Sequence, residues 1–324
     1  MLIYLQRSWR NLIHRQELVV FSLLLIAISL LSLLTNTFLT NNNLFNLARN
    51  FSWIAIAAFG ESMVIIIGGI DLSVGAVMGL AGMITAMSLQ AGYPVPWSLG
   101  AGLLAGGLVG WLNGLLVGRI RLPPFVVTLG TLSIARGITF GLAGGWPIRN
   151  LPEGFRFLGQ ADLILGPWLV PIPMIVTVLL ALLVAFLLDY TVLGRYIYTL
   201  GGSERALVVS GIEHTQVKIL VYTLCGLLTA LGGILMTARL GVAAPTAASG
   251  YELDIIAAAV IGGTSFFGGE GSILGVLLGA AFMQVLRNGL VLLGLPAYLQ
   301  SAAIGAMILI ALLLDYWRRQ RATQ

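Results

Sequence analysis

The side chains in this sequence that could do chemistry are a few ionisable groups within long apolar segments. Glu61, Arg136 and Arg287 fall inside such segments, and Glu252 and Asp254 lie near the start of another. A charged group is costly in hydrocarbon, so it usually faces the interior of a helix bundle or water. A buried carboxylate can hold a proton, which makes Glu61 a candidate proton site for ion-coupled transport.

Two glycine-rich breaks interrupt the apolar pattern. Gly68–Gly75 has the sequence GGIDLSVG, and Gly262–Ser272 has the sequence GGTSFFGGEGS. Each break precedes a run with regularly spaced glycines, as at corresponding positions in two halves of a transporter, where interrupted helices mark the path. The candidate path residues are Asp71, Ser73, Thr264 and Ser265. Asp71, Ser73 and Ser272 also suit helix capping, which binds free backbone N–H groups, and for Asp71 capping is favoured over substrate contact.

The motifs of a self-sufficient enzyme are absent from the sequence. A G-x-x-x-x-G-K-[ST] phosphate loop cannot exist, because the single lysine, Lys218, follows Val217. The histidines, His14 and His214, lie in polar segments without an H-E-x-x-H motif, and Cys225 alone cannot form a disulfide or metal framework. We therefore expect no enzyme activity and no cofactor in this chain. Energised transport would draw on a partner or an ion gradient.

The composition is that of a membrane protein. The mean hydropathy is +0.99, and 9% of residues are charged, against roughly 25% in soluble domains. The 324 residues suffice for about ten spans of ~20 residues. The net charge of +5 comes from basic residues scattered singly at the ends of apolar runs, a pattern that argues against nucleic-acid binding.

Ten apolar runs define the expected architecture. They fall at 18–35, 51–68, 72–90, 98–118, 124–143, 171–188, 218–238, 251–267, 272–292 and 298–314. Ten spans place both termini on one face, which then carries Arg7, Arg10, Arg15, Arg119, Arg121, Arg195, Arg205, Lys218, Arg318, Arg319 and Arg321, while Arg49, Arg149, Arg156 and Arg239 lie opposite. Since basic residues concentrate inside, the termini and the loop 189–218 are expected to be cytoplasmic, and 144–173 external. We predict an all-α membrane protein with one domain, 1–324.

Glycines at four-residue intervals predict close helix packing. They are Gly102, Gly106, Gly110, Gly114 and Gly118 in one run and Gly271, Gly275 and Gly279 in another. Small residues at this spacing let helix backbones approach in lipid, where apolar burial itself drives little association. The sequence therefore indicates a compact bundle.

The two long polar segments each allow two interpretations. In 189–218, Ser203 suits the N-cap of a short helix, Glu204 suits the positive end of its dipole, and Gly211 suits its left-handed end. This helix either meets a partner or belongs to an ordinary connecting loop. Prolines and glycines in 144–173 argue against a helix throughout. That segment is either a docking or gating surface or a plain interfacial loop.

Several blocks in order along nearly the whole chain resemble a known family. GGIDLSVGA, LGRYIYTLGGSERALVVSGI and SGYELDIIAAAVIGGTSFFGGEGS are similar to blocks in the permease subunits of bacterial ribose-type sugar ABC importers, the ribose/xylose/autoinducer-2 permease family. The resemblance implies a multi-pass protein of the bacterial inner membrane that pairs with a second permease, either itself or a paralogue. It also implies ATPase subunits, which bind ATP and Mg, and an external or periplasmic sugar-binding protein.

The resemblance also implies a role for the short helix. The matching residues expected to couple the permease to its ATPase are Gly202, Ser203, Glu204, Arg205, Ala206, Ser210 and Gly211. Family members often have asparagine at the place of Ser203, and both residues cap helices. No role for Glu61 follows from the resemblance. The alternative is an ion-coupled secondary transporter that uses Glu61 or Asp71 and works without an ATPase.

Overall fold

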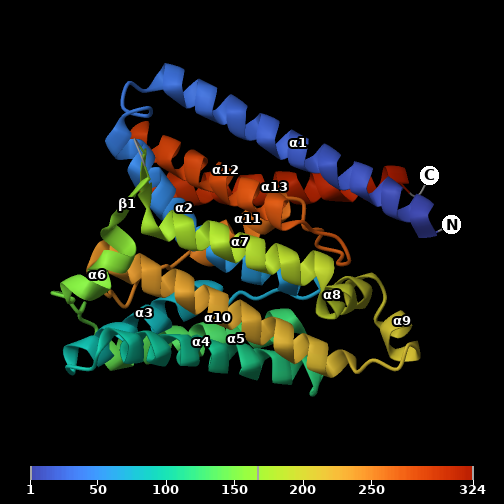
Figure 1. Ribbon diagram of the computed structural model, residues 1–324, viewed down its shortest axis with the longest axis horizontal. Coiled ribbons are helices and arrows are strands. Elements are labelled where there is room, and N and C mark those ends of the chain that lie inside the picture. The colour runs from blue at the N-terminus through green and yellow to red at the C-terminus, as the bar shows by residue number, and fades with distance from the viewer. Residues whose placement is uncertain (1, 166–167, 323–324) are drawn as a thin grey trace.

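The computed structural model describes the backbone of residues 2–165 and 168–322, with the side chains of 17–164, 169–296, 298–310 and 313. All ten apolar runs lie mainly on helices of this part (Figure 1). These helices are α1 (Leu2–Leu34), α2 (Asn41–Ile66), α3 (Val74–Gln90), α4 (Val95–Gly118), α5 (Pro124–Ala143), α7 (Ile172–Tyr190), α10 (His214–Leu240), α11 (Tyr251–Ile261), α12 (Ile273–Leu292) and α13 (Ala297–Ala322). His14 and the basic residues counted near the termini, Arg7, Arg10, Arg15, Arg318, Arg319 and Arg321, lie outside the described side chains.

Six of these helices are long and apolar enough to cross a membrane. Within the described residues they are α1, from Glu17 onward, with α4, α5, α7, α10 and α12. Shorter apolar helical stretches occur at Val74–Gln90 and Tyr298–Ile310. The predominantly helical membrane architecture predicted from the apolar runs is confirmed at this level.

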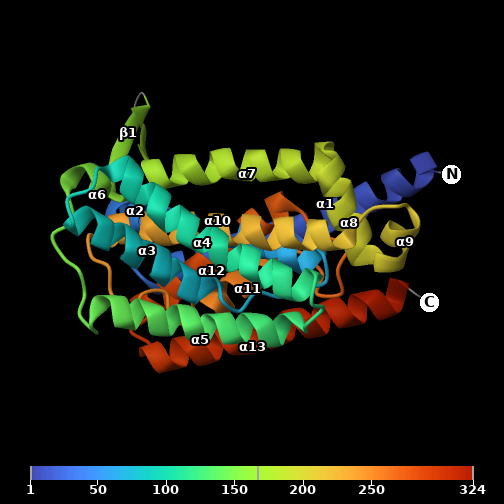
Figure 2. The ribbon, with the colours of Figure 1, turned by 90° about the horizontal axis from the view of Figure 1, so that it is seen from below.

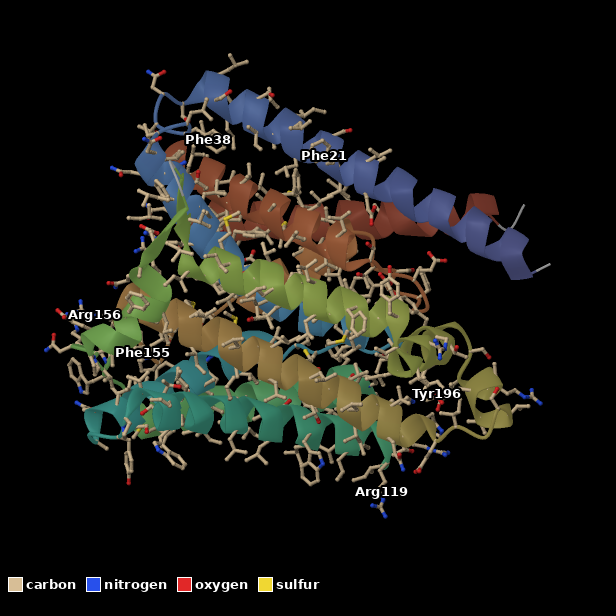
Figure 3. All side chains as sticks on the ribbon, viewed as in Figure 1. Phe21, Phe38, Arg119, Phe155, Arg156 and Tyr196 are labelled. Carbon is tan, nitrogen blue, oxygen red and sulfur yellow. The ribbon has the colours of Figure 1, made fainter. Side chains whose placement is uncertain are left out.

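The polar segments fold into short elements at opposite ends of the bundle. The segment 144–173 holds α6 (Glu153–Gln160) and an antiparallel hairpin of β1 (Asp162–Leu165) and β2 (Trp168–Pro171). The segment 189–218 holds α8 (Val192–Gly202) and α9 (Glu204–Val209). The start of α1 and the end of α13 lie at the α9 end (Figures 1 and 2). Arg119 and Tyr196 also lie toward this end, whereas Phe155 and Arg156 lie at the α6 end (Figure 3).

The core forms around α2 and α10. Every residue of α2 from Ser52 to Ile66 is buried, and α10 packs against α2, α3 and α4. The α4 glycines face these neighbours: a Cβ added at Gly106 would lie 2.6 Å from the carbonyl oxygen of Gly226, and one at Gly114 would lie 2.6 Å from the Cα of Ile219. Such contacts require backbones that touch, which is the packing expected from the glycine spacing.

The glycines of α12 produce a second close contact. A Cβ at Gly279 would lie 2.8 Å from the backbone nitrogen of Gly262, and a Cβ at Gly275 would overlap the Gly262 carbonyl oxygen. Gly271 lies just before the helix, where a Cβ would meet the side chain of Ile66 at 2.8 Å. The α12 helix therefore packs backbone to backbone against the end of α11.

The two glycine-rich breaks end their helices in the same way. The matching bonds run from Gly68 N to Ile65 O (2.9 Å) and Gly69 N to Val64 O (2.9 Å), and from Gly263 N to Val260 O (2.9 Å) and Thr264 N to Ala259 O (3.0 Å). Gly68 and Gly263 both have positive φ, +79° and +100°, the conformation that lets glycine close a helix end. A helix therefore ends at each break, and the correspondence between the two breaks extends to individual hydrogen bonds.

Candidate functional site: an exposed capped helix and a buried polar break

The short helix predicted between Ser203 and Gly211 is present as α9. Ser203 Oγ accepts a hydrogen bond from the backbone N–H of Ala206 at 3.2 Å, which satisfies one free donor of the first turn. Gly211 has φ +77°, and its N–H donates to Val208 O at 2.9 Å. Both helix ends are thus formed by the residues that the sequence marks for them.

Glu204 attaches α9 to the start of α10, a contact that sequence reasoning missed. Its Oε2 lies 3.0 Å from Lys218 Nζ, and its Oε1 lies 3.2 Å from His214 Nε2. The spacing of these residues in the sequence does not predict the contact. The contact forms because the loop between α9 and α10 brings the side chains together. The Glu204 side chain is 49% exposed, so the ion pair contributes at most about 1 kcal/mol.

The outer surface of α9 is open to solvent. All seven predicted coupling residues, Gly202, Ser203, Glu204, Arg205, Ala206, Ser210 and Gly211, are exposed. Leu207 is buried and anchors the helix, whereas Val209 is 81% exposed. A capped helix with one anchored face and exposed apolar and charged side chains on the other suits contact with a partner protein.

The helix α8 links α9 to both interrupted helices. Gly269 N donates to Ile66 O at 2.8 Å, which joins the second break to the end of α2. Gly201 of α8 lies against this junction so closely that a Cβ there would be 2.5 Å from Gly269 N and would overlap Ile66 O. Tyr198 OH donates to Gly271 O at 2.9 Å. Movement of α8 would therefore act on both breaks.

The first break holds a buried polar cluster. Asp71 Oδ1 accepts hydrogen bonds from Ser73 N (2.8 Å) and Ser73 Oγ (2.5 Å), so Asp71 closes the turn before α3. Asn113 of α4 donates to Asp71 Oδ2 (3.3 Å) and Ser73 Oγ (3.1 Å), and the Asp71 N–H donates to Glu61 Oε1 (3.1 Å). An isolated asparagine in an apolar run gives no spacing signal, so sequence reasoning missed Asn113.

The four predicted path residues form two separate groups. Asp71 and Ser73 belong to the cluster at the first break, whereas Ser265 N donates to Glu270 O (3.0 Å) within the second. All four, including Thr264, are at most 2% exposed. The structure thus describes a conformation in which these residues are closed off from solvent.

A polar cavity lies at the α6 end. Its volume is about 310 Å³, and it is lined by Asn150, Leu151, Arg156, Gln160, Leu240 and Gly241. Arg49 forms an ion pair with Asp162 (2.6 Å) and donates to Gln160 O (3.2 Å). The segment 144–173 is therefore fixed to the bundle by charged contacts.

The cationic groups within the spans have partners of their own. Arg136 donates to the carbonyl oxygens of Pro245 (3.2 Å) and Ala247 (2.7 Å). Arg287 lies 3.1 Å from Asp254 and stacks over the Tyr251 ring, 4.6 Å from its centroid. Burial of these charges is thus compensated within the bundle.

Comparison with known proteins places this architecture in a transporter family. Residues 43–312, which include both breaks and the α8–α9 segment, match the family described as branched-chain amino acid transport system / permease component. The chain belongs to this permease family. It is accordingly a multi-pass inner-membrane protein.

Relatives within this permease family resemble the chain over almost its full length. It is 40% identical over 317 residues to the ribose import permease protein RbsC of Escherichia coli, covering 96% of both chains. It is 41% identical to RbsC of Bacillus subtilis, covering 93% of this chain and 92% of that one. The D-allose transport system permease protein AlsC of E. coli is 39% identical, with 88% of this chain and 86% of the relative covered.

Proposed function

We propose that this permease is the membrane subunit of an ATP-binding cassette importer that carries a ribose-like monosaccharide across the bacterial inner membrane. The observation that carries the proposal is the 40% identity to a ribose import permease over 96% of both chains. The family description refers to amino acid transport, so the sugar class rests on the individual relatives, which include ribose and allose permeases.

We propose that α9 is the coupling element for a separate ATPase, which binds ATP and Mg. Its exposed residues, with Arg205 and Val209 among them, form the contact, while Leu207 anchors it to the permease. Closure of the ATPases pulls α9, and α8 conveys the displacement to Ile66 and Gly269 at the two breaks. The path residues Asp71, Ser73, Thr264 and Ser265 are then exposed in turn to the two sides.

The orientation and assembly follow from the same proposal. The ten apolar runs form the spans, the termini and α9 are cytoplasmic, and the α6 end receives an external sugar-binding protein. A second permease, either a copy of this chain or a paralogue, completes the path. The position of the α1 start and the α13 end at the α9 end supports this arrangement (Figure 1).

Buried Glu61 supports one alternative, an ion-coupled secondary transporter. The test is uptake of labelled ribose by cells with and without this gene, measured once with ATP depleted and the proton gradient kept, and once with the gradient collapsed and ATP kept. We expect gene-dependent uptake that stops only when ATP is depleted. The same assay with labelled allose, fructose and arabinose ranks the sugars.

Each other outcome has a definite meaning. Uptake that stops only when the gradient is collapsed would overturn the ATP-driven proposal in favour of the carboxylate. ATP-dependent uptake of one of the other labelled sugars in place of ribose would keep the mechanism and change the cargo. Absence of gene-dependent uptake of any of the four sugars would reject the monosaccharide proposal.

A further inference from the structure

Two buried carboxylates, Glu61 and Asp71, belong to one hydrogen-bonded cluster at the first break, and no cation pairs with them among the described side chains. Glu61 is 0% exposed and Asp71 2% exposed, and the Asp71 backbone N–H donates to Glu61 Oε1. Among the described side chains, neither carboxylate forms an ion pair with lysine, arginine or histidine. Two negative charges buried in one cluster repel each other and lose the solvation of water, so the state with both carboxylates ionised is strongly disfavoured.

The surroundings of the pair contain further unused polar atoms. Asn113 Oδ1 and the Tyr222 hydroxyl are fully buried and have no hydrogen-bond partner among the described residues. The Tyr222 hydroxyl is close to the break, since it lies 2.5 Å from the position of a Cβ on Gly69. Such orphaned groups are costly unless a ligand or a proton can engage them.

Among the described side chains, those that face the pair are neutral or acidic. The connection itself supplies Ser73, α4 supplies Asn113, and α10 supplies Tyr222 and Cys225, whose thiol is 4.0 Å from Glu61 Oε2 and 3.9 Å from Thr229 Oγ1. Within the described residues, no group of three or more histidine, cysteine, aspartate or glutamate side chains could hold a metal ion. A proton is the cation that fits this site without further ligands.

The hydrogen bonds indicate which carboxylate carries the proton. Asp71 accepts bonds from Ser73 N, Ser73 Oγ and Asn113 Nδ2, all of which stabilise a negative charge. Glu61 accepts one backbone bond and has a thiol at 4.0 Å. The negative charge is therefore better placed on Asp71 and the proton on Glu61.

We propose that Glu61 and Asp71 form a proton-binding site inside the membrane, where one proton on Glu61 holds the α2–α3 connection in its place against α4 and α10. Release of this proton would leave two adjacent charges and drive the connection apart. Because the connection contains candidate path residues, the proton would make transport sensitive to pH. The proton site itself does not depend on which cargo is carried.

Infrared spectroscopy of the full chain in lipid bilayers tests the site without requiring transport. A protonated carboxylic acid has a carbonyl stretch separate from the carboxylate bands. We expect such a band at neutral pH, its loss on alkalinisation, and its loss in Glu61→Gln but not in Glu153→Gln, which removes a carboxylate that is 94% exposed. Absence of the band at neutral pH, or its persistence unchanged in Glu61→Gln, would overturn the proposal.

Two further measurements address the alternatives that sodium occupies the site and that Glu61→Gln fails to fold. The spectrum is repeated with sodium replaced by choline at constant pH; a band that appears only without sodium would overturn the proton in favour of sodium. If Glu61→Gln does not fold, Glu61→Asp replaces it: the band should then change position, and a band unchanged in position would overturn the proposal. Where uptake is measurable, it should fall as the pH rises above neutral in the unmodified chain and stay constant in Glu61→Gln.

Discussion

At the scale of single residues, Glu204 and Arg205 are neighbours with different roles. Glu204 binds Lys218 and His214 of the same chain, so part of its contribution is to hold α9 in place. Arg205 is exposed, and within the part of the chain that the structure describes it forms no ion pair or side-chain hydrogen bond. If α9 contacts an ATPase, Arg205 is the side chain better placed to reach it.

Arg205→Ala should weaken association with the ATPase subunit about tenfold while leaving the permease folded. Arginine is enriched among the interface residues whose truncation costs more than about 1 kcal/mol, and a loss of about 1.4 kcal/mol lowers the affinity tenfold. The measurement is the affinity of purified ATPase for the permease in bilayers. Arg195→Ala, which removes an exposed arginine of α8 outside the coupling set, is the matched control. Equal affinity for both variants would exclude Arg205 from the contact.

At the scale of elements, the sequence predicts helices that have a long apolar run, regularly spaced glycines or clear capping residues. It does not predict elements that depend on tertiary contacts. The ten apolar runs and the α9 caps are visible because apolar length, glycine spacing and capping residues act locally. The run 251–267 extends past the end of α11 at Ile261, since apolarity alone does not reveal the turn at Gly263. The elements α6, β1 and β2 were missed because they are short and polar or proline-flanked.

The residues of the candidate site also fall into those that the sequence marks locally and those that only tertiary contacts bring to the site. Glycines and an aspartate mark the two breaks in the sequence. Their surroundings, such as Asn113 beside Asp71 and Gly201 beside Ile66, come from other helices and carry no local signal. Sequence reasoning therefore included Gly202 among the coupling residues but passed over its neighbour Gly201, which makes the close contact.

Adjacent glycines of α8 allow a direct test of that contact. Gly201→Ala should lower the free energy of unfolding by about 1–3 kcal/mol, because its Cβ would collide with backbone atoms of Ile66 and Gly269. Gly202→Ala should change it by less than about 0.5 kcal/mol, since nothing lies within 4 Å of its Cβ position. Unfolding of both variants in detergent micelles measures the difference. Similar changes in the free energy of unfolding for both variants would show that the backbone at this junction shifts readily to accommodate an added methyl group.

At the scale of the whole molecule, the two ends of the bundle are predicted to face opposite sides of the membrane. Cysteine labelling can determine this, because the only native cysteine, Cys225, is buried and should not react. In spheroplasts, a membrane-impermeant thiol reagent should label Glu153→Cys at once and Arg205→Cys only after permeabilisation. The unmodified chain is the control for background labelling. The reverse pattern would invert the proposed orientation and place α9 outside.

The position of α1 has a consequence for biosynthesis. This helix lies along the edge of the bundle and packs mainly against α12 through Leu24, Leu31 and Phe282 (Figure 1). A ribosome makes α12 only after most of the chain has emerged, so α1 must wait in the bilayer without its partner. It can do so because its apolar segment is long enough to span alone. Docking of α1 is therefore a late step in assembly.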